Sequence, residues 1–172
     1  MSITTAPPTA AERPTLVRHL VLAALLAITA VNYIQRNSIG AAETTIRAEL
    51  KLDMRDTGDA ISAFFLTYAL LQVPSGWLAQ RLGARAALTL YAAGWSAATG
   101  LCALADGLLG LYAARLLMGA LQAGIFPCCT LILASWYPTS RRGLASALLN
   151  SFMLIGGAVG VPLTAVLLGP LG

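Results

Sequence analysis

Five apolar stretches, each long enough to cross a lipid bilayer, constrain this chain more than any other feature. A membrane-spanning helix needs about 20 mostly apolar residues. The stretches cover residues 19–43, 57–79, 85–105, 108–136 and 144–170. Only 10% of the 172 residues are charged, whereas soluble domains average about 25%. The sequence therefore predicts an all-α, multi-pass integral membrane protein.

The segments outside these stretches define the remaining organisation. Residues 1–17 are polar and contain prolines, which predicts a disordered tail before one membrane domain over residues 18–172. The links between the third and fourth stretches and between the fourth and fifth are short, so these helices should be antiparallel neighbours. The net charge of +4 comes from isolated arginines that form no basic face, so we expect no nucleic-acid partner.

Lysine and arginine in the loops predict an orientation. Cytoplasmic loops of membrane proteins carry an excess of these residues. With the N-terminus inside, the inner segments hold six basic residues, Arg13, Arg18, Arg81, Arg85, Arg141 and Arg142. The outer segments then hold only three, Arg47, Lys51 and Arg55. We therefore predict a cytoplasmic N-terminal tail.

Arg36 and Arg115 lie inside the spans, where no aspartate or glutamate accompanies them. A charge in the bilayer costs at least about 2.5–3.5 kcal/mol, so it usually faces a bundle interior or a wet cavity. If the first helix ends near Glu43 and the fourth begins near Leu108, both arginines lie roughly 10 Å below the outer surface. Such a positive site favours an anion, because a carboxylate binds a guanidinium through two parallel hydrogen bonds. The alternative is that each arginine snorkels to the outer interface.

Helical spacing places uncharged polar residues near the two arginines. The candidate binding residues are Tyr33, Arg36, Tyr68, Arg115, Gln122 and Asn150. Gly119 lies between Arg115 and Gln122 on one face of the fourth helix, so we expect it to leave room between their side chains. For the uncharged members, the alternative is ordinary hydrogen bonding between helices.

Glycines and prolines inside the spans carry information about packing. Gly156 and Gly160 are four residues apart, which predicts close approach to another helix. Pro127 and Pro162 predict kinks, which membrane helices tolerate when neighbours satisfy the freed backbone groups. These patterns indicate structure and are weak indicators of function.

The spans lack the residue patterns that chemistry requires. They contain no helical His/Glu metal spacing, no paired acids and no Ser–His pair, so we predict that the chain is not an enzyme. Cys102, Cys128 and Cys129 all lie in apolar runs, which indicates packing rather than a metal site or a disulfide. We expect no metal and no cofactor.

The stretch GWLAQRLGAR, residues 76–85, lies between the second and third spans on the predicted inner side. It resembles the signature G-x-L-a-D-R-x-G-x-R of the major facilitator superfamily. The matching residues are Gly76, Leu78, Ala79, Arg81, Gly83 and Arg85, whereas Gln80 stands where that family usually has aspartate. The missing acid puts the family's inner-side charge lock in doubt.

A narrower resemblance is to the anion:cation symporter branch of that superfamily. It rests on NYIQR in the first span, YALLQVPSGWLA in the second, and RLLMGALQAGIFP and SWYPTSRRGLASA across the fourth and fifth. The resemblance implies twelve helices in two six-helix halves, with the substrate held between them. It makes this chain five helices of an N-terminal half, without the sixth helix and without the C-terminal half.

The same resemblance implies roles for individual residues. Arg36 matches the arginine that contacts the substrate carboxylate, and tyrosines that match Tyr33 and Tyr68 line the same pocket. Two carboxylates usually complete the machinery of this branch, and here Gln35 and Gln122 occupy their places. Glutamine takes up no proton near neutral pH, so we expect proton coupling through these helices to be missing.

The function implied is transport of a small organic anion, such as a sugar acid, by alternating access in a bacterial inner membrane. The residues do not distinguish a polyhydroxy acid from an aromatic acid. A facilitator, an exchanger and coupling located elsewhere all remain open. The alternative from another class is a non-transporting, sensor-like relative or an inactive truncated remnant, because the loss of both acids fits it equally well.

Overall fold

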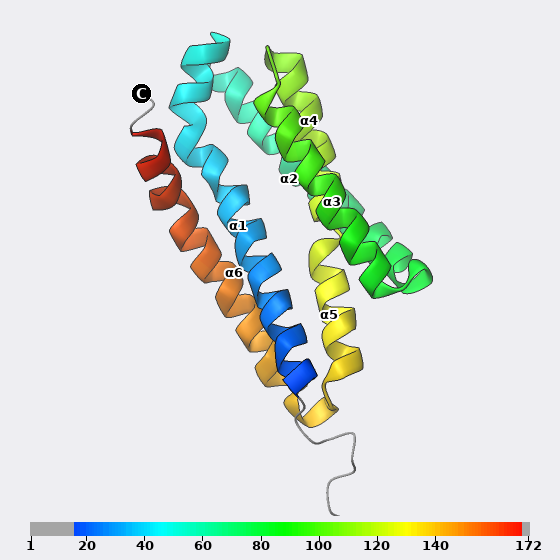
Figure 1. Ribbon diagram of the computed structural model, residues 1–172. Helices are drawn as coiled ribbons and strands as arrows, with labels where there is room; N and C mark the ends of the chain where they lie inside the picture. Colours follow the sequence, from blue (N-terminus) through cyan, green and yellow to red (C-terminus); the bar gives the residue numbers. More distant parts are fainter. Residues whose placement is uncertain (1–15, 170–172) are drawn as a thin grey trace, which may run out of the picture.

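The structure, a computed structural model, describes residues 16–169 of the chain. Six α-helices make up this part and it contains no strand (Figure 1). Their bounds are α1 Leu16–Leu50, α2 Met54–Leu82, α3 Ala84–Ala103, α4 Leu108–Gln122, α5 Ile125–Trp136 and α6 Thr139–Leu168. The all-α prediction is confirmed for these residues. α1 begins two residues inside the predicted tail, and the rest of that tail lies outside the described residues.

Four helical spans in the described part of the chain are long and apolar enough to cross a membrane. They are Leu16–Leu50, Met54–Leu82, Leu108–Trp136 and Thr139–Leu168. α3 has 20 residues but is not among these four. The fifth crossing therefore stays a prediction.

The fourth predicted span is one apolar helical span, Leu108–Trp136, and it is interrupted near Pro127, as the predicted kink requires. α4 ends at Gln122 and α5 begins at Ile125, with Ala123 and Gly124 between them. Pro127 lies one turn beyond the break, and its ring nitrogen has no proton to donate to the Ala123 carbonyl. The break therefore falls where the proline removes a hydrogen bond of the helix, earlier than the predicted kink at Pro127 itself.

Two groups of helices form the bundle, and α5 joins them. α1 and α6 pack along their length as a parallel pair, while α2, α3 and α4 form the second group (Figure 1). α5 contacts helices of both groups. The buried core gathers around α3, α4 and α5 and includes Tyr91, Trp95, Met118, Cys128 and Leu133.

Gly156 and Gly160 let α6 approach the backbone of α1. A Cβ atom at Gly156 would lie 2.9 Å from Ala30 Cα, and one at Gly160 would lie 2.7 Å from the Ile34 carbonyl oxygen. Neither backbone group can move aside without separating the helices. The predicted close packing by these two glycines is therefore confirmed.

Gly119 has a different role from the one predicted. A Cβ atom there would strike the Phe64 carbonyl and the Thr67 hydroxyl of α2. Thr67 Oγ1 also donates a hydrogen bond to the Leu116 carbonyl oxygen at 2.8 Å. Gly119 therefore allows α4 to pack against α2, and it does not open space between Arg115 and Gln122.

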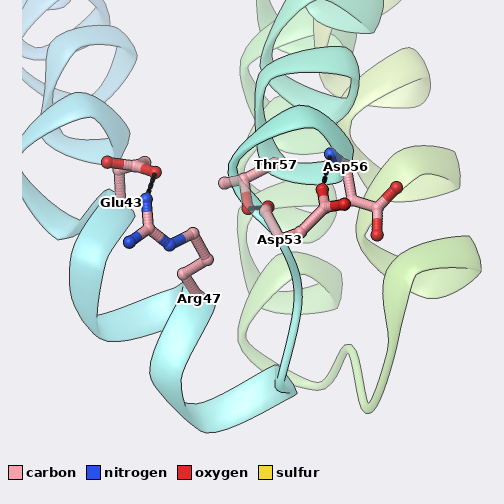
Figure 2. A network of polar contacts seen from close by, with 5 residues as sticks. All are labelled: Glu43, Arg47, Asp53, Asp56 and Thr57. Atoms are coloured by element: carbon pink, nitrogen blue, oxygen red, sulfur yellow. Dashed lines mark hydrogen bonds and ion pairs between the residues drawn. The ribbon is translucent and has the colours of Figure 1, made fainter.

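α1 continues to Leu50, well past the predicted end near Glu43. Arg47 forms an ion pair with Glu43 one turn earlier, at 3.1 Å. After a short turn, Asp53 caps α2 by accepting a hydrogen bond from the Asp56 N–H at 2.7 Å (Figure 2). Arg36 therefore lies about 20 Å from the end of α1 along the helix axis, deeper than the estimate based on Glu43.

Candidate anion site between the helices

Arg36 lies half-buried against a group of aromatic rings from α1 and α2. Its guanidinium carbon is 4.2 Å from the Tyr68 ring centroid and 4.8 Å from that of Phe64. The rings of Phe65 and Tyr33 lie at 5.0 and 5.4 Å. Aromatic faces attract a guanidinium, by about 0.5 kcal/mol at exposed sites and about 2 kcal/mol or more where water is excluded. Their faces hold the charge in place inside the bundle.

Arg115 lies deeper in the bundle, with 1% of its surface exposed. Its guanidinium carbon is 4.7 Å from the centroid of the same Phe64 ring. Its Nε and Nη1 atoms are buried and have no hydrogen-bond partner among residues 16–169. The structure thus brings the two predicted arginines to one aromatic ring, from helices that lie far apart in the sequence.

Within residues 16–169 no carboxylate forms an ion pair with Arg36 or Arg115, although Glu49 lines the same cavity as Arg115. The acids of the described chain are Glu43, Glu49, Asp53, Asp56, Asp59 and Asp106. All lie in the last turns of α1, the first turns of α2 or the link between α3 and α4. The single ion pair within residues 16–169 joins Arg47 to Glu43. A buried charge without a partner is costly, so the site is ready to take up a negative group.

The two glutamines at the family's acidic positions bond to each other. Gln122 Nε2 donates to Gln35 Oε1 at 2.7 Å, and Trp95 Nε1 donates to the same oxygen at 3.0 Å. Gln35 Nε2 in turn donates to Thr99 Oγ1 and to the sulfur of Met118, both at 3.1 Å. One neutral side chain therefore ties α1 to α3 and α4, next to Arg36 in the sequence.

Several residues of this arrangement were not among the predicted ones. The Phe64 ring contacts the guanidiniums of both arginines. Trp95 and Thr99 form hydrogen bonds with the side chain of Gln35. The available signal for Phe64 is its position one turn before Tyr68, on the same face of α2. Its ring stacks on that of Tyr68 with centroids 5.9 Å apart.

Asn150 does not join the other candidate residues. It is exposed, and its amide donates to the Ser146 carbonyl within α6 at 2.9 Å. A polar residue in a helix can satisfy itself on its own backbone one turn earlier. The structure therefore gives Asn150 no role beside the two arginines.

The stretch 76–85 forms the turn between α2 and α3. Gly83 is the only residue between the two helices and has φ of +85°, which favours glycine. Gly76 faces Pro127, with 3.4 Å between a Cβ atom built there and Pro127 Cβ. Arg81, Arg85 and Gln80 are exposed. Because a glutamine side chain is neutral, Gln80 offers no charge to either arginine.

This bundle of long apolar helices, with two arginines held inside it, defines an integral multi-pass membrane protein. Residues 25–172 match the family model of the Major Facilitator Superfamily. The chain belongs to that superfamily, which confirms the resemblance drawn from residues 76–85.

Curated relatives in this family are anion transporters. The chain is 32% identical over 155 residues to a probable sulfoacetate transporter of Cupriavidus necator, covering 90% of this chain and 36% of the relative. It is 34% identical to a probable galactarate/D-glucarate transporter of Escherichia coli K12, covering 85% and 34%. It is 31% identical to a D-galactonate transporter of Escherichia coli O6:H1, covering 91% and 36%. The chain thus spans about a third of these relatives, which are transporters and not enzymes.

A solved structure shares the fold. It is the crystal structure of a bacterial homologue of the human lysosomal transporter Spinster, in an inward-facing, unoccupied conformation. The TM-score is 0.78 at 26% sequence identity, over 86% of this chain and 31% of that one. The arrangement of helices is therefore that of a transporter of this superfamily.

Proposed function

We propose that this chain forms the N-terminal part of a transporter for small organic anions, with Arg36 as the group that binds the carboxylate. The observation that carries the proposal is the pair of guanidiniums on Phe64, in a bundle whose described carboxylates all lie near helix ends. A substrate carboxylate supplies the missing negative charge. Alternating access then needs the second half, against which this half moves around a site near the midplane.

The substrate class that suits the site best is a sugar acid. The N–H edges of Arg36 bind the carboxylate, while the hydroxyls of Tyr33 and Tyr68 lie on the rings that flank its guanidinium. Phenolic hydroxyls donate and accept hydrogen bonds, which suits a chain of substrate hydroxyls. Relatives named for galactarate, D-glucarate and D-galactonate support this choice.

The coupling mode follows from Gln35 and Gln122. Both side chains stay neutral across the physiological pH range, and each is engaged by the hydrogen bond that joins them. A proton-coupled cycle needs a group that is charged in one state and neutral in another. The transporter therefore runs as a facilitator, as an exchanger, or with its coupling group outside helices α1 to α6.

Orientation and location form part of the same proposal. With the N-terminus in the cytoplasm of a bacterium, the exposed arginines at the α2–α3 turn and the start of α6 face the cytoplasm. The acid-rich end then faces outward across the inner membrane. The positive-inside rule supports this arrangement.

The test is uptake of radiolabelled D-glucarate into proteoliposomes that hold the complete transporter. Arg36→Gln removes the charge while keeping a hydrogen-bonding side chain. Because hydrogen bonds to charged groups contribute about 1.5–3 kcal/mol, we expect uptake at low substrate concentration to fall about tenfold or more.

The matched control is Arg47→Gln, which removes an arginine of the same helix near its outer end and should leave uptake nearly unchanged. Equal uptake by Arg36→Gln and the parent protein would contradict the assignment of Arg36. Binding of D-glucarate without any flux would instead support a sensor-like protein.

A further inference from the structure

The two ends of the bundle carry opposite charge. Four exposed arginines, Arg81, Arg85, Arg141 and Arg142, lie at the α2–α3 turn and in the first turn of α6. We name this region the arginine end. All acids of residues 16–169 lie at the opposite end, so no described carboxylate balances these arginines. An unopposed basic surface at a membrane interface attracts anionic lipid.

Aromatic rings hold two of these arginines in place. The guanidinium carbon of Arg81 lies 4.1 Å from the Trp77 ring centroid, and that of Arg85 lies 5.4 Å from the Trp136 ring centroid. Neither guanidinium pairs with a carboxylate within the described residues. A stacked guanidinium keeps the donors at its edge free for a planar or tetrahedral anion. Tryptophan is also the residue enriched at the level of lipid headgroups.

A cavity of about 440 Å³ opens between the α2–α3 turn and α5, with Arg85 in its lining. Arg85 and Ser135 are its polar residues, and Leu82, Leu131 and Ile132 supply apolar walls. The Ser135 hydroxyl donates to the Ile132 carbonyl at 2.7 Å, which leaves its oxygen lone pairs and the charge of Arg85 to set the polarity of the cavity. One side of the cavity therefore suits an anion, and the other suits hydrocarbon.

We propose that this cavity binds the headgroup of an anionic phospholipid. The phosphodiester lies against the edge of the Arg85 guanidinium, with Arg81 adding charge from the end of α2. The first part of an acyl chain covers Leu131 and Ile132. An acidic protein segment would match the charge of Arg85, but its polar side chains would not match the apolar wall of Leu82, Leu131 and Ile132.

The lipid site is independent of the proposed function. It lies at the α2–α3 turn and the end of α5, whereas Arg36 and Arg115 meet on Phe64 in the middle of α2. Failure of D-glucarate transport would leave the lipid site standing, and the reverse also holds.

Native mass spectrometry of the detergent-purified full chain tests the proposal. The chain is titrated with phosphatidylglycerol or cardiolipin, and with phosphatidylethanolamine of the same acyl chains. We expect the anionic lipids to bind several-fold more tightly than the zwitterionic one. Arg85→Gln should weaken anionic lipid binding about fivefold, the effect of one arginine near an anionic surface.

The matched control is Arg55→Gln, an exposed arginine in the first turn of α2 at the opposite end. It should change lipid binding little. Ser135→Glu is a second variant that places a negative charge in the cavity from an exposed position, and it should abolish the preference even if Arg85→Gln folds poorly.

Three results would overturn the proposal. They are equal binding of phosphatidylethanolamine, equal weakening by Arg55→Gln and Arg85→Gln, and an unchanged lipid preference in Ser135→Glu. Displacement of the lipid by polyglutamate peptide at comparable concentration would point to an acidic protein partner and would also count against it.

Discussion

Neutral side chains beside the arginines determine how the site behaves at the scale of single residues. Gln35 and Gln122 are joined by a hydrogen bond of 2.7 Å. Because both side chains are uncharged amides, neither can neutralise Arg36 or Arg115. A guanidinium does not lose its proton in proteins. The site therefore keeps the same charge at every physiological pH, which supports the proposal that its occupant is an anion.

Gln122→Glu should make transport depend on pH, whereas the parent protein should transport equally from pH 6 to pH 8. Burial disfavours the charged form of a carboxyl group, and Gln122 is only 1% exposed, so a glutamate there should take up a proton as the pH is lowered. Protonated glutamate can still donate to Gln35, but ionised glutamate cannot. Uptake by the variant should therefore fall as pH rises, measured as initial rates of D-glucarate uptake at fixed substrate concentration.

Gln80→Glu is the matched control for that variant. Gln80 is exposed at the α2–α3 turn, so a carboxyl there is ionised throughout this pH range and should add no slope between pH 6 and 8. A steep pH dependence in the parent protein would show that another group carries the proton and would refute the account of coupling.

Small residues determine which helices approach closely at the scale of elements. Gly156 and Gly160 lie against the α1 backbone, and Gly119 lies against α2. The first pair was predictable, because glycines four residues apart form one stripe. Gly119 was not, because polar neighbours suggested a cavity and only the fold reveals that α2 crosses there.

Gly156→Ala should destabilise the bundle. The added methyl would lie 2.9 Å from Ala30 Cα, and overpacking of this kind typically costs about 1–3 kcal/mol. Thermal unfolding in detergent should therefore occur several degrees lower. Gly143→Ala, also in α6, meets no atom within 4 Å and should melt at or above the parent temperature. Equal melting of the two variants would mean that α1 and α6 pack differently.

Sequence periodicity predicted the helices well but not the aromatic support of the site. Apolar length fixes where helices run, since each span needs about 20 residues. The kink near Pro127 was predicted, but its position at Ala123–Gly124 was not, because a proline indicates a disruption without giving the residue at which it falls. The role of Phe64 was not predicted, because apolar spans contain many aromatic residues. Only the tertiary packing shows that this ring contacts both arginines.

Charge separates along the described part of the bundle, with exposed arginines at the α2–α3 turn and the start of α6 and the acids at the other end. Figure 2 shows part of the acidic end, where Glu43 and Asp53 each bind a partner within the same turn. A charge asymmetry of this kind fixes the orientation of a bundle in the membrane. The proposed anion site at Phe64 lies in the middle of α2, away from the arginine end at the α2–α3 turn.

Orientation is testable by cysteine labelling in intact bacterial cells. Lys51 lies in the exposed turn between α1 and α2, and Arg141 lies at the start of α6. The two test variants are Lys51→Cys and Arg141→Cys. A membrane-impermeant maleimide should label only the first, and disruption of the cells should expose the second. Labelling of Arg141→Cys alone in intact cells would reverse the orientation.

The central claim is that negative charge, recognised by Arg36, is what admits a solute to this site. Calorimetric titration of the complete transporter with galactarate and with galactitol tests it most directly, because the two share their hydroxyl stereochemistry and differ in charge. We predict that galactarate binds at least tenfold more tightly, and that Arg36→Gln removes most of this difference. Equal binding of the uncharged polyol, or an unchanged difference in Arg36→Gln, would contradict the claim.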